Sequence, residues 1–220
     1  MPRAIRSWRR RIRDSVHQEG FWRFLFRAAR APVYREAHVD SVPLQHEIEE
    51  DGEVVPDLTV RTAEEDDGAA LIALRPEYRP EMLRARFRAG DACFISLVDE
   101  CIASARWVSL RRVHLDYLGL VLPLQHGEIY IYEVFTRPEH RAKVVRKATS
   151  HALQEHYRSL GFRSNLGYVI PWRKPFGPDF RFRVATIRIL RLGPLRKFWV
   201  RTYGPQADYW RERLKELRWA

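Results

Sequence analysis

The stretch from Glu133 to Leu153, EVFTRPEHRAKVVRKATSHAL, has the pattern of a strand that enters a helix through a tight turn. Many folds bind phosphate at such a turn, because the backbone N–H groups of a helix N-terminus point at the anion. These cradles are built from glycine, which lets the phosphate approach the backbone closely. This stretch contains no glycine, and the turn from Arg141 to Lys147 reads RAKVVRK. An anion could therefore bind there through basic side chains rather than through the backbone.

Other chemistries have little support in the residue types. Cys93 and Cys101 show neither a Cys-x-x-Cys spacing nor a nearby histidine pair, so no metal site is expected. We expect them to be two buried free thiols in a reducing compartment. His114, His126 and His140 fall in expected loops or turns without a nucleophile beside them, so a hydrolase triad is not expected either.

The chain is strongly basic, with a formal net charge of +11 over 220 residues. This balance implies an acidic partner: a nucleotide, a nucleic acid, an anionic lipid or an acidic protein. The apolar runs are far shorter than a membrane span. The arginine-rich N-terminus lacks the uninterrupted apolar core of a signal peptide, so we expect a cytoplasmic protein.

Residues 1–36 are predicted to form a basic amphipathic helical extension, because Ile5, Trp8, Ile12 and Val16 recur at helical spacing with arginines between them. Two interpretations stay open. The extension could pack its aromatic face on the domain or on a second copy in a homodimer, or it could lie on an anionic membrane surface as a peripheral contact. Residues 37–57 are acidic and are interpreted as a linker. The folded domain is expected over residues 58–220.

The pattern within that domain predicts an α/β fold, with helices on both faces of a mixed sheet. The order is strand, helix, helix, three strands, helix, strand, loop and strand, followed by a terminal helix. The expected elements are strands at 58–63, 93–98, 102–109, 128–136, 165–170 and 182–192, and helices at 64–74, 80–89, 141–160 and 209–219. Residues 117–124 could form a further extended piece outside this order.

This order and five stretches resemble the GNAT superfamily, the Gcn5-related N-acetyltransferases, over roughly residues 58–192. One of the five is Gly161-Phe162-Arg163, which resembles the usual end of the helix after the turn. LTVRTAEEDD from Leu58 resembles the family's opening strand, and RAGDACFISLVDECIASARWV from Arg88 resembles its central hairpin. IYIYEVFTRPEHR from Ile129 resembles the strand and turn of the cofactor site, and IRILRL from Ile187 resembles the closing strand. The resemblance implies a GNAT-like mixed, mostly antiparallel central sheet flanked by helices.

In that family, the strand before the turn splays from its neighbour and pairs with the pantetheine arm of acetyl-CoA, and the turn binds the pyrophosphate. The resemblance implies acetyl-CoA or another acyl-CoA as donor. Only Arg141 matches the family's turn, because Val144 replaces its first glycine and Arg146 its second small residue. The motif is thus degenerate, and we expect it to hinder the usual pyrophosphate pose. The implied donor-binding residues are Val134, Phe135, Thr136, Arg141, Ala142, Lys143, Val144, Val145, Arg146 and Lys147.

The resemblance also implies direct attack of a substrate amine on a thioester, with a carboxylate that removes the amine proton. The candidates are Glu133, beside the implied pantetheine-pairing stretch, and Glu128, at the start of the strand. The two-residue period of a strand predicts that they point to opposite faces. Glu133 could instead be a structural carboxylate paired with an arginine, and Glu128 is expected to be solvated.

The sequence offers weaker candidates for the general acid that would protonate the departing thiolate than for the base. Tyr130, Tyr132 and Tyr168 are candidates, although strand tyrosines also pack in cores. Residues 171–179, where many family members have an asparagine and then a tyrosine, contain neither.

Three functions are therefore compatible with the sequence. The first is a GNAT-type N-acyltransferase that uses acyl-CoA and an unidentified amine acceptor, and this is our prediction. The second is an acyltransferase whose donor is an acyl-carrier protein or an aminoacyl-tRNA, both of which are acidic. The third is a non-catalytic binding protein. The altered turn argues against the first function, and the retained strand at 128–136 argues against the third.

Overall fold

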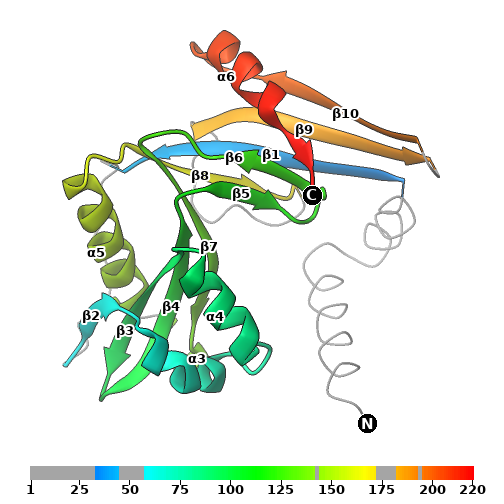
Figure 1. The fold of residues 1–220 in the computed structure, drawn as a ribbon. Coiled ribbons are helices and arrows are strands. Elements are labelled where there is room, and N and C mark those ends of the chain that lie inside the picture. The colour runs from blue at the N-terminus through cyan, green and yellow to red at the C-terminus, as the bar shows by residue number, and fades with distance from the viewer. Residues whose placement is uncertain (1–32, 45–56, 142–143, 172–181, 193–194) are drawn as a thin grey trace. The chain divides into compact units, whose positions relative to one another are not determined.

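The computed structural model describes residues 33–44, 57–141, 144–171, 182–192 and 195–220 (Figure 1). The chain divides into two compact units. Within the described residues, no helix is both long and apolar enough to cross a membrane. Unit 1 comprises residues 1–39, 115–120 and 168–215, and unit 2 comprises residues 40–114, 121–167 and 216–220.

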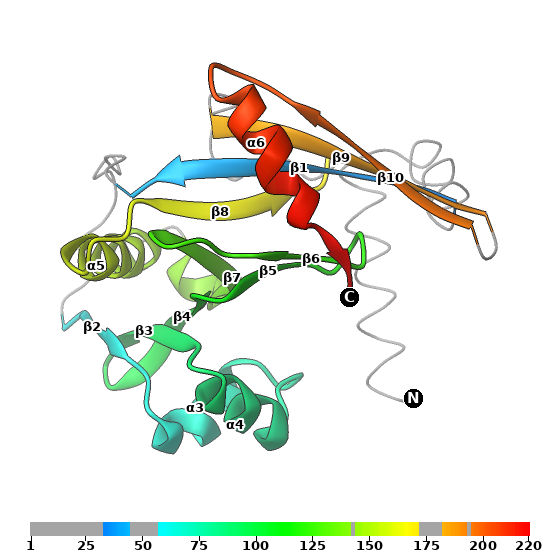
Figure 2. The same ribbon diagram turned by 45° about the horizontal axis from the view of Figure 1, so that its top comes forward.

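Unit 1 contains three neighbouring strands in the order β10-β9-β1. They are β1 (Tyr34–Pro43), which continues past Val39 into unit 2, β9 (Arg183–Leu192) and β10 (Leu195–Thr202). The helix α6 (Ala207–Arg213) packs against β9 and β10 and buries Trp210 (Figure 2).

Two elements of unit 1 differ from the sequence-based expectation. Residues 34–36 and 37–43, expected in the helical extension and the linker, form β1, because Ala37 and Val39 alternate with polar residues and are buried. The remainder of the expected N-terminal helix, residues 1–32, lies outside the described residues. The expected terminal helix over 209–219 ends at Arg213 and is followed by a 3₁₀ turn and the short strand β11 (Arg218–Trp219) of unit 2.

Unit 2 is built on a sheet with the order β8-β7-β4-β3-β2. Its strands pair antiparallel except for β7 and β8, which are parallel. The predicted α/β class with a mixed, mostly antiparallel sheet is thus confirmed. The strands are β2 (Thr59–Thr62), β3 (Ala92–Val98), β4 (Cys101–Ser109), β7 (Glu128–Thr136) and β8 (Ser164–Val169), and a smaller ladder contains β5 (Arg112–Leu115) and β6 (Leu120–Pro123).

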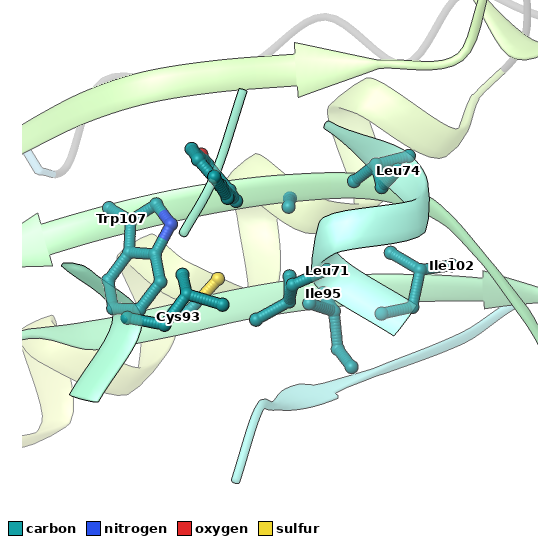
Figure 3. Packing of buried hydrophobic residues seen from close by; sticks show 9 residues of the cluster. Leu71, Leu74, Cys93, Ile95, Ile102 and Trp107 are labelled. Atoms are coloured by element: carbon teal, nitrogen blue, oxygen red, sulfur yellow. The ribbon is translucent and has the colours of Figure 1, made fainter. Parts of the chain in front are cut away.

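Helices cover both faces of this sheet because successive residues of β3 point to opposite sides. Cys93 and Ile95 pack with Leu71 and Leu74 of α3 (Gly68–Leu74) and with the fully buried Trp107 of β4 (Figure 3). The second helix on this core is α4 (Pro80–Arg88), which contributes Leu83.

The opposite face of the sheet is covered by α5 (Val145–Ser159). Its Leu153 and Tyr157 pack with Phe94 of β3. The helix begins at Val145 rather than at the expected residue 141, after a 3₁₀ turn at Pro138–His140. The side chains at 145, 149, 153 and 157 are buried, as expected for one stripe of a helix whose neighbours lie four residues apart.

The expectation of two buried thiols is half wrong. Cys93 is buried, but Cys101 is exposed, because it starts β4 directly after a two-residue turn. Both turn residues, Asp99 and Glu100, have positive φ, of 49° and 62°. That conformation is typical of the tight hairpin turns whose twist matches that of the flanking strands.

Candidate active site along strand β7

Strand β7 carries an irregularity at Glu133. The β4–β7 ladder pairs Trp107 with Tyr132 and Ala105 with Phe135, so the two residues Glu133 and Val134 oppose Arg106 alone. Two residues against one define a β-bulge. Glu133 has a φ of 46°, a left-handed conformation that costs a residue other than glycine about 1–3 kcal/mol. The surrounding contacts must therefore hold this residue in place.

The contact that holds Glu133 is a two-pronged ion pair with Arg86 of α4. Nη1 and Nη2 of Arg86 donate to the two carboxylate oxygens of Glu133, each at 2.8 Å. Parallel hydrogen bonds of this kind are the strongest carboxylate–arginine geometry. Nη1 of Arg75 lies 3.8 Å from the same carboxylate. The arginine pairing left open by the sequence is thus present, and it comes from Arg86 of α4 and from Arg75, the residue after α3, both distant in the chain.

Aromatic rings surround the Arg86 guanidinium. Its central carbon lies 5.0 Å from the ring centroid of Trp107, 5.2 Å from that of Tyr132 and 5.3 Å from that of Tyr78. A cation over an aromatic face is attracted by the ring quadrupole, more strongly where water is excluded. Tyr132 and Glu133, although consecutive, both contact Arg86, because the bulge changes the alternation of the strand.

The cluster shifts the pKa values of its members. Burial alone would raise the pKa of Glu133, but the hydrogen bonds from Arg86 and the charges of Arg86 and Arg75 outweigh burial and hold it below the ordinary value of 4.5. Burial, followed by the interaction with Glu133, raises the pKa of Tyr78 to about 12. Glu133 is therefore ionised at neutral pH.

This lowered pKa predicts how stability depends on pH. A carboxylate whose folded pKa lies below its unfolded value stabilises the fold above the unfolded value, and the contribution is lost as pH falls through the folded pKa. We expect the melting temperature of the wild type to exceed that of Glu133→Gln at neutral pH. The difference should begin to shrink near the ordinary pKa of 4.5 and disappear below the folded pKa. Melting curves recorded across the acid range test this, and a difference that stays constant down to strong acid would contradict it.

Beside Glu133, no strand among the described residues pairs with β7 on the side away from β4. The parallel β7–β8 ladder runs only from Glu128–Ser164 to Tyr130–Leu166. The next N–H, that of Ile131, donates to Oδ1 of Asn165 at 3.1 Å, so a side chain takes the place of the strand partner. From Ile131 to Thr136 this edge of β7 is not in register with β8, and Val134 is 48% exposed.

Unit 2 thus contains β2, α3, α4, β3, β4, β7, α5 and β8 in chain order, as the resemblance to the GNAT superfamily implied. The end of the β7–β8 ladder corresponds to the implied splay before the turn. Unit 2 has a GNAT-like fold. The candidate active site consists of the edge of β7 that is not paired with β8, of Glu133 and of the start of α5.

Comparison with known proteins adds little beyond this fold. No protein-family model and no curated protein matches the chain. An aminoglycoside acetyltransferase from an uncultured soil metagenomic sample matches over 50% of this chain and 76% of its own, with a TM-score of 0.38 and 17% identity. An N-acetyltransferase from Staphylococcus aureus Mu50 matches over 50% and 71%, at 0.39 and 12%. The PaiA N-acetyltransferase of Thermoplasma acidophilum, solved with coenzyme A, matches over 48% and 75%, at 0.36 and 12%. Scores this low establish neither family membership nor an activity.

Three of the implied donor-binding residues, Val134, Phe135 and Thr136, lie at the end of β7, along its open edge. Thr136 is buried, with its hydroxyl 3.1 Å from that of Ser104. The Ser104 hydroxyl also donates to the carbonyl of Phe135 at 2.9 Å, and Val134 is the exposed member of the three. Nε of Arg141 donates to the carbonyl of Thr136 at 3.2 Å, which ties the turn back to the strand end.

The rest of the implied turn is only partly described. Ala142 and Lys143 lie outside the described residues. Val144 precedes the helix with helical φ and ψ of −56° and −19°. Val145 is fully buried against Val98 and Ala103, so its side chain is part of the core. Arg146 is exposed and Lys147 is half-buried, so cationic side chains surround the first turn of α5.

Arg106, the residue opposite the bulge, was not predicted from the sequence. It is 7% exposed, and its Nη2 donates to the carbonyl of Arg146 at 2.6 Å while Nη1 donates to the Ser150 hydroxyl. Burial, and then the charge of Arg146, lower the pKa of Arg106 to about 10. The group stays charged at neutral pH and adds positive potential beneath the start of α5. No local pattern marks it, because a strand arginine is usually solvated.

The expectation that Glu128 is solvated is wrong. Glu128 is 6% exposed, and its Oε2 accepts from the N–H of Gln125 at 2.8 Å, so its side chain folds back over the preceding turn. The catalytic role assigned to Glu128 stays a prediction.

The candidate acids are engaged in structural contacts. Tyr132 donates to Oδ2 of Asp91 at 2.6 Å, and burial followed by this bond raises its pKa. Tyr130 donates to the carbonyl of His114 at 3.2 Å. Tyr168 lies on the part of β8 that belongs to unit 1. In the loop over 171–179, residues 172–179 lie outside the described residues. Within the described part of the chain, no three His, Cys, Asp or Glu side chains could hold a metal ion together.

Proposed function

We propose that this protein is a GNAT-type acyltransferase that transfers an acyl group from a thioester donor to an amine. The observation that carries the proposal is the early end of the β7–β8 ladder at Tyr130–Leu166. An open strand edge offers backbone N–H and C=O groups to an extended ligand with amides of its own, in the way that an added strand binds. The pantetheine arm of an acyl thioester has such amides.

The chemistry proposed for this edge is aminolysis. The amine nitrogen attacks the thioester carbonyl, the C–N bond forms, and the C–S bond breaks with release of the thiolate. The amine loses one proton to a base, and the thiolate takes up one proton to become the thiol. Glu133 supports the base role by position and by its ionised state at neutral pH. Its lowered pKa makes it a weak base, so we propose that it acts through water and stabilises the cationic nitrogen as it forms.

For the donor, we propose a pantetheine thioester bound mainly through the pantetheine arm. The altered turn supports this, because Val144 stands where the family has glycine and a side chain there occupies space that the pyrophosphate needs. Cations at Arg146 and Lys147 still favour a phosphate group. Acyl-CoA and the prosthetic group of an acyl-carrier protein share the pantetheine arm, and the experiment below separates these two sources.

Calorimetric titration with acetyl-CoA, a longer acyl-CoA and an acyl-pantetheine without the nucleotide tests the donor. We expect the acyl-pantetheine to bind within about tenfold of the acyl-CoA, because the turn contributes little. Val144→Gly should tighten acetyl-CoA by about tenfold and leave acyl-pantetheine unchanged, since only the former carries the pyrophosphate. Arg146→Gln should weaken binding of acetyl-CoA and leave acyl-pantetheine unchanged, because only CoA carries the phosphates that this cation favours. Arg158→Gln, at the far end of α5, is its matched control.

Either part can fail separately. Wild-type affinity for acetyl-CoA in the micromolar range, unchanged by Val144→Gly, would contradict the degenerate turn but keep the acyltransferase. Absence of binding of every pantetheine thioester at millimolar concentration, with no thermal stabilisation beside it, would contradict the proposed function. A transfer assay with acyl-CoA and an acyl-carrier protein as alternative donors separates the two sources. Transfer from the carrier protein without transfer from acyl-CoA would assign the donor to the carrier.

A further inference from the structure

The β9–β10 hairpin of unit 1 has an unusual composition for a pair of strands. Its described residues include six arginines and lysines and no aspartate or glutamate. The last pair of its ladder is Leu192 with Leu195, and each of these leucines is 50% exposed. We call these two residues the tip leucines. An exposed apolar pair at the end of a basic hairpin favours contact with an apolar partner beside an acidic one.

On one face of this hairpin, exposed apolar and basic side chains continue away from the tip. Leu195, Lys197, Trp199 and Arg201 alternate along β10, so they share a face, and all four are exposed. Trp199 is 50% exposed and pairs across the ladder with the exposed Arg188. The middle of the other face is covered, although Arg196 near the tip is exposed. On this face Ile187 and Ile189 are fully buried, and α6 packs against the hairpin (Figure 2).

The positive charge of this face is only partly compensated. Nε of Arg188 lies 3.0 Å from Oε2 of Glu36 on β1. The guanidinium of Arg201 lies 5.5 Å from the ring centroid of Tyr203, a contact that leaves its charge uncompensated. Because neither strand contains an acidic residue, the described residues of this face carry a net positive charge around an exposed indole.

Two acidic macromolecules could meet such a face, and the tip leucines distinguish them. A single-stranded nucleic acid would use the cations and stack a base on Trp199, but it offers nothing apolar to Leu192 and Leu195. An anionic membrane surface offers a contact to each of these groups. Its acyl chains would contact the leucines, its interfacial region would hold the tryptophan, and its acidic headgroups would pair with the cations. The spacing of the side chains along β10 agrees with this docking. Trp199 lies four residues from Leu195, or ~13 Å at about 3.3 Å per residue, which places it near the headgroups when the tip enters the acyl boundary.

We propose that the β9–β10 hairpin docks this protein on an anionic membrane surface, with the tip leucines inserted and with Trp199, Lys197 and Arg201 at the headgroups. The contact needs no acyltransferase activity and does not rest on the proposed function. It also differs from a contact through the N-terminal segment, because it uses only described residues of unit 1.

The test is co-sedimentation of the full chain with vesicles of phosphatidylcholine alone and of phosphatidylcholine with about 30% phosphatidylserine. We expect binding only to the second composition, weakened by added salt. The double variant Leu192→Ser, Leu195→Ser and the charge-reversed Lys197→Glu, Arg201→Glu should each lower the partition coefficient by about tenfold or more. The matched control reverses two exposed charges elsewhere, Arg84→Glu with Arg158→Glu, and should bind within about threefold of the wild type.

Because the hairpin residues changed are exposed, melting curves should show that every variant folds. Vesicle binding that survives both hairpin variants would assign the membrane contact to another part of the chain and overturn the proposal. So would an absence of vesicle binding combined with tight binding of a single-stranded RNA oligonucleotide that is lost in Trp199→Ala. A dimer in sedimentation velocity that the serine variant converts to a monomer, without vesicle binding, would show that the tip contacts a second copy instead.

Discussion

Arg86→Met is expected to lower the free energy of unfolding by about 2–3 kcal/mol. The reason is that the substitution leaves the half-buried carboxylate of Glu133 without its two-pronged partner, while Glu133 keeps its left-handed conformation. Removing one partner of a fully buried ion pair costs about 3–5 kcal/mol, and the partial exposure of Glu133 reduces that figure. Urea unfolding measures the change.

A double-mutant cycle separates the ion pair from the packing of Arg86 on its three rings. Arg86→Met with Glu133→Gln should be more stable than the sum of the two single changes predicts, because the double variant has no uncompensated charge. The exposed pair between Lys215 and Glu212, whose side chains are 67% and 69% exposed, is the control. Its removal should change the free energy of unfolding by less than about 0.5 kcal/mol. Additive single changes at Arg86 and Glu133 would show that the ion pair does not hold the bulge.

Glu133→Gln is expected to lower kcat of acyl transfer by about 100-fold and to leave KM for the donor unchanged. This follows from the base role assigned to Glu133 under the proposed function, because an amide cannot accept the amine proton. Glutamine has nearly the same shape, so the groove and the donor contacts on β7 should persist. Steady-state kinetics with an amine acceptor and a pantetheine thioester measure both constants.

A structural carboxylate could also reduce activity when it is changed, so a second variant is needed. In the wild type, the Arg75 cation lies 3.8 Å from Glu133 and lowers the pKa of Glu133. The variant Arg75→Met removes this cation. Without that cation the pKa of Glu133 rises. If Glu133 must be ionised for transfer, the acidic limb of the kcat profile moves to higher pH. A profile that stays in place, with kcat reduced in both variants, would limit Glu133 to positioning the strand.

The candidate site was predictable in part. The position of the turn after β7 and the strand residues 134–136 followed from the order of apolar and turn residues and from the GNAT resemblance. The burial of Arg106 could not be predicted, because an arginine in a strand is ordinarily solvated. Only the position of Arg106 under α5 makes it buried. The burial of Glu128 was missed for a similar reason, since the turn at Gln125 that its carboxylate closes is not visible in the period of the strand.

What the sequence determined by itself is the order of the main elements of unit 2, from β2 through α3, α4, β3, β4, β7 and α5 to β8, and the absence of glycine from the turn. These depend on periodicity and turn residues within a few positions, which act locally. Only the tertiary structure decided the bulge at Glu133, the early end of the β7–β8 ladder, and the pairing of residues 34–43 and 195–202 as strands. Each of these depends on a partner far away in the chain, such as Arg86 for Glu133 or Asn165 for Ile131. Local patterns cannot show which distant side chain arrives to satisfy a carboxylate or a backbone N–H, because packing of the whole unit makes that choice.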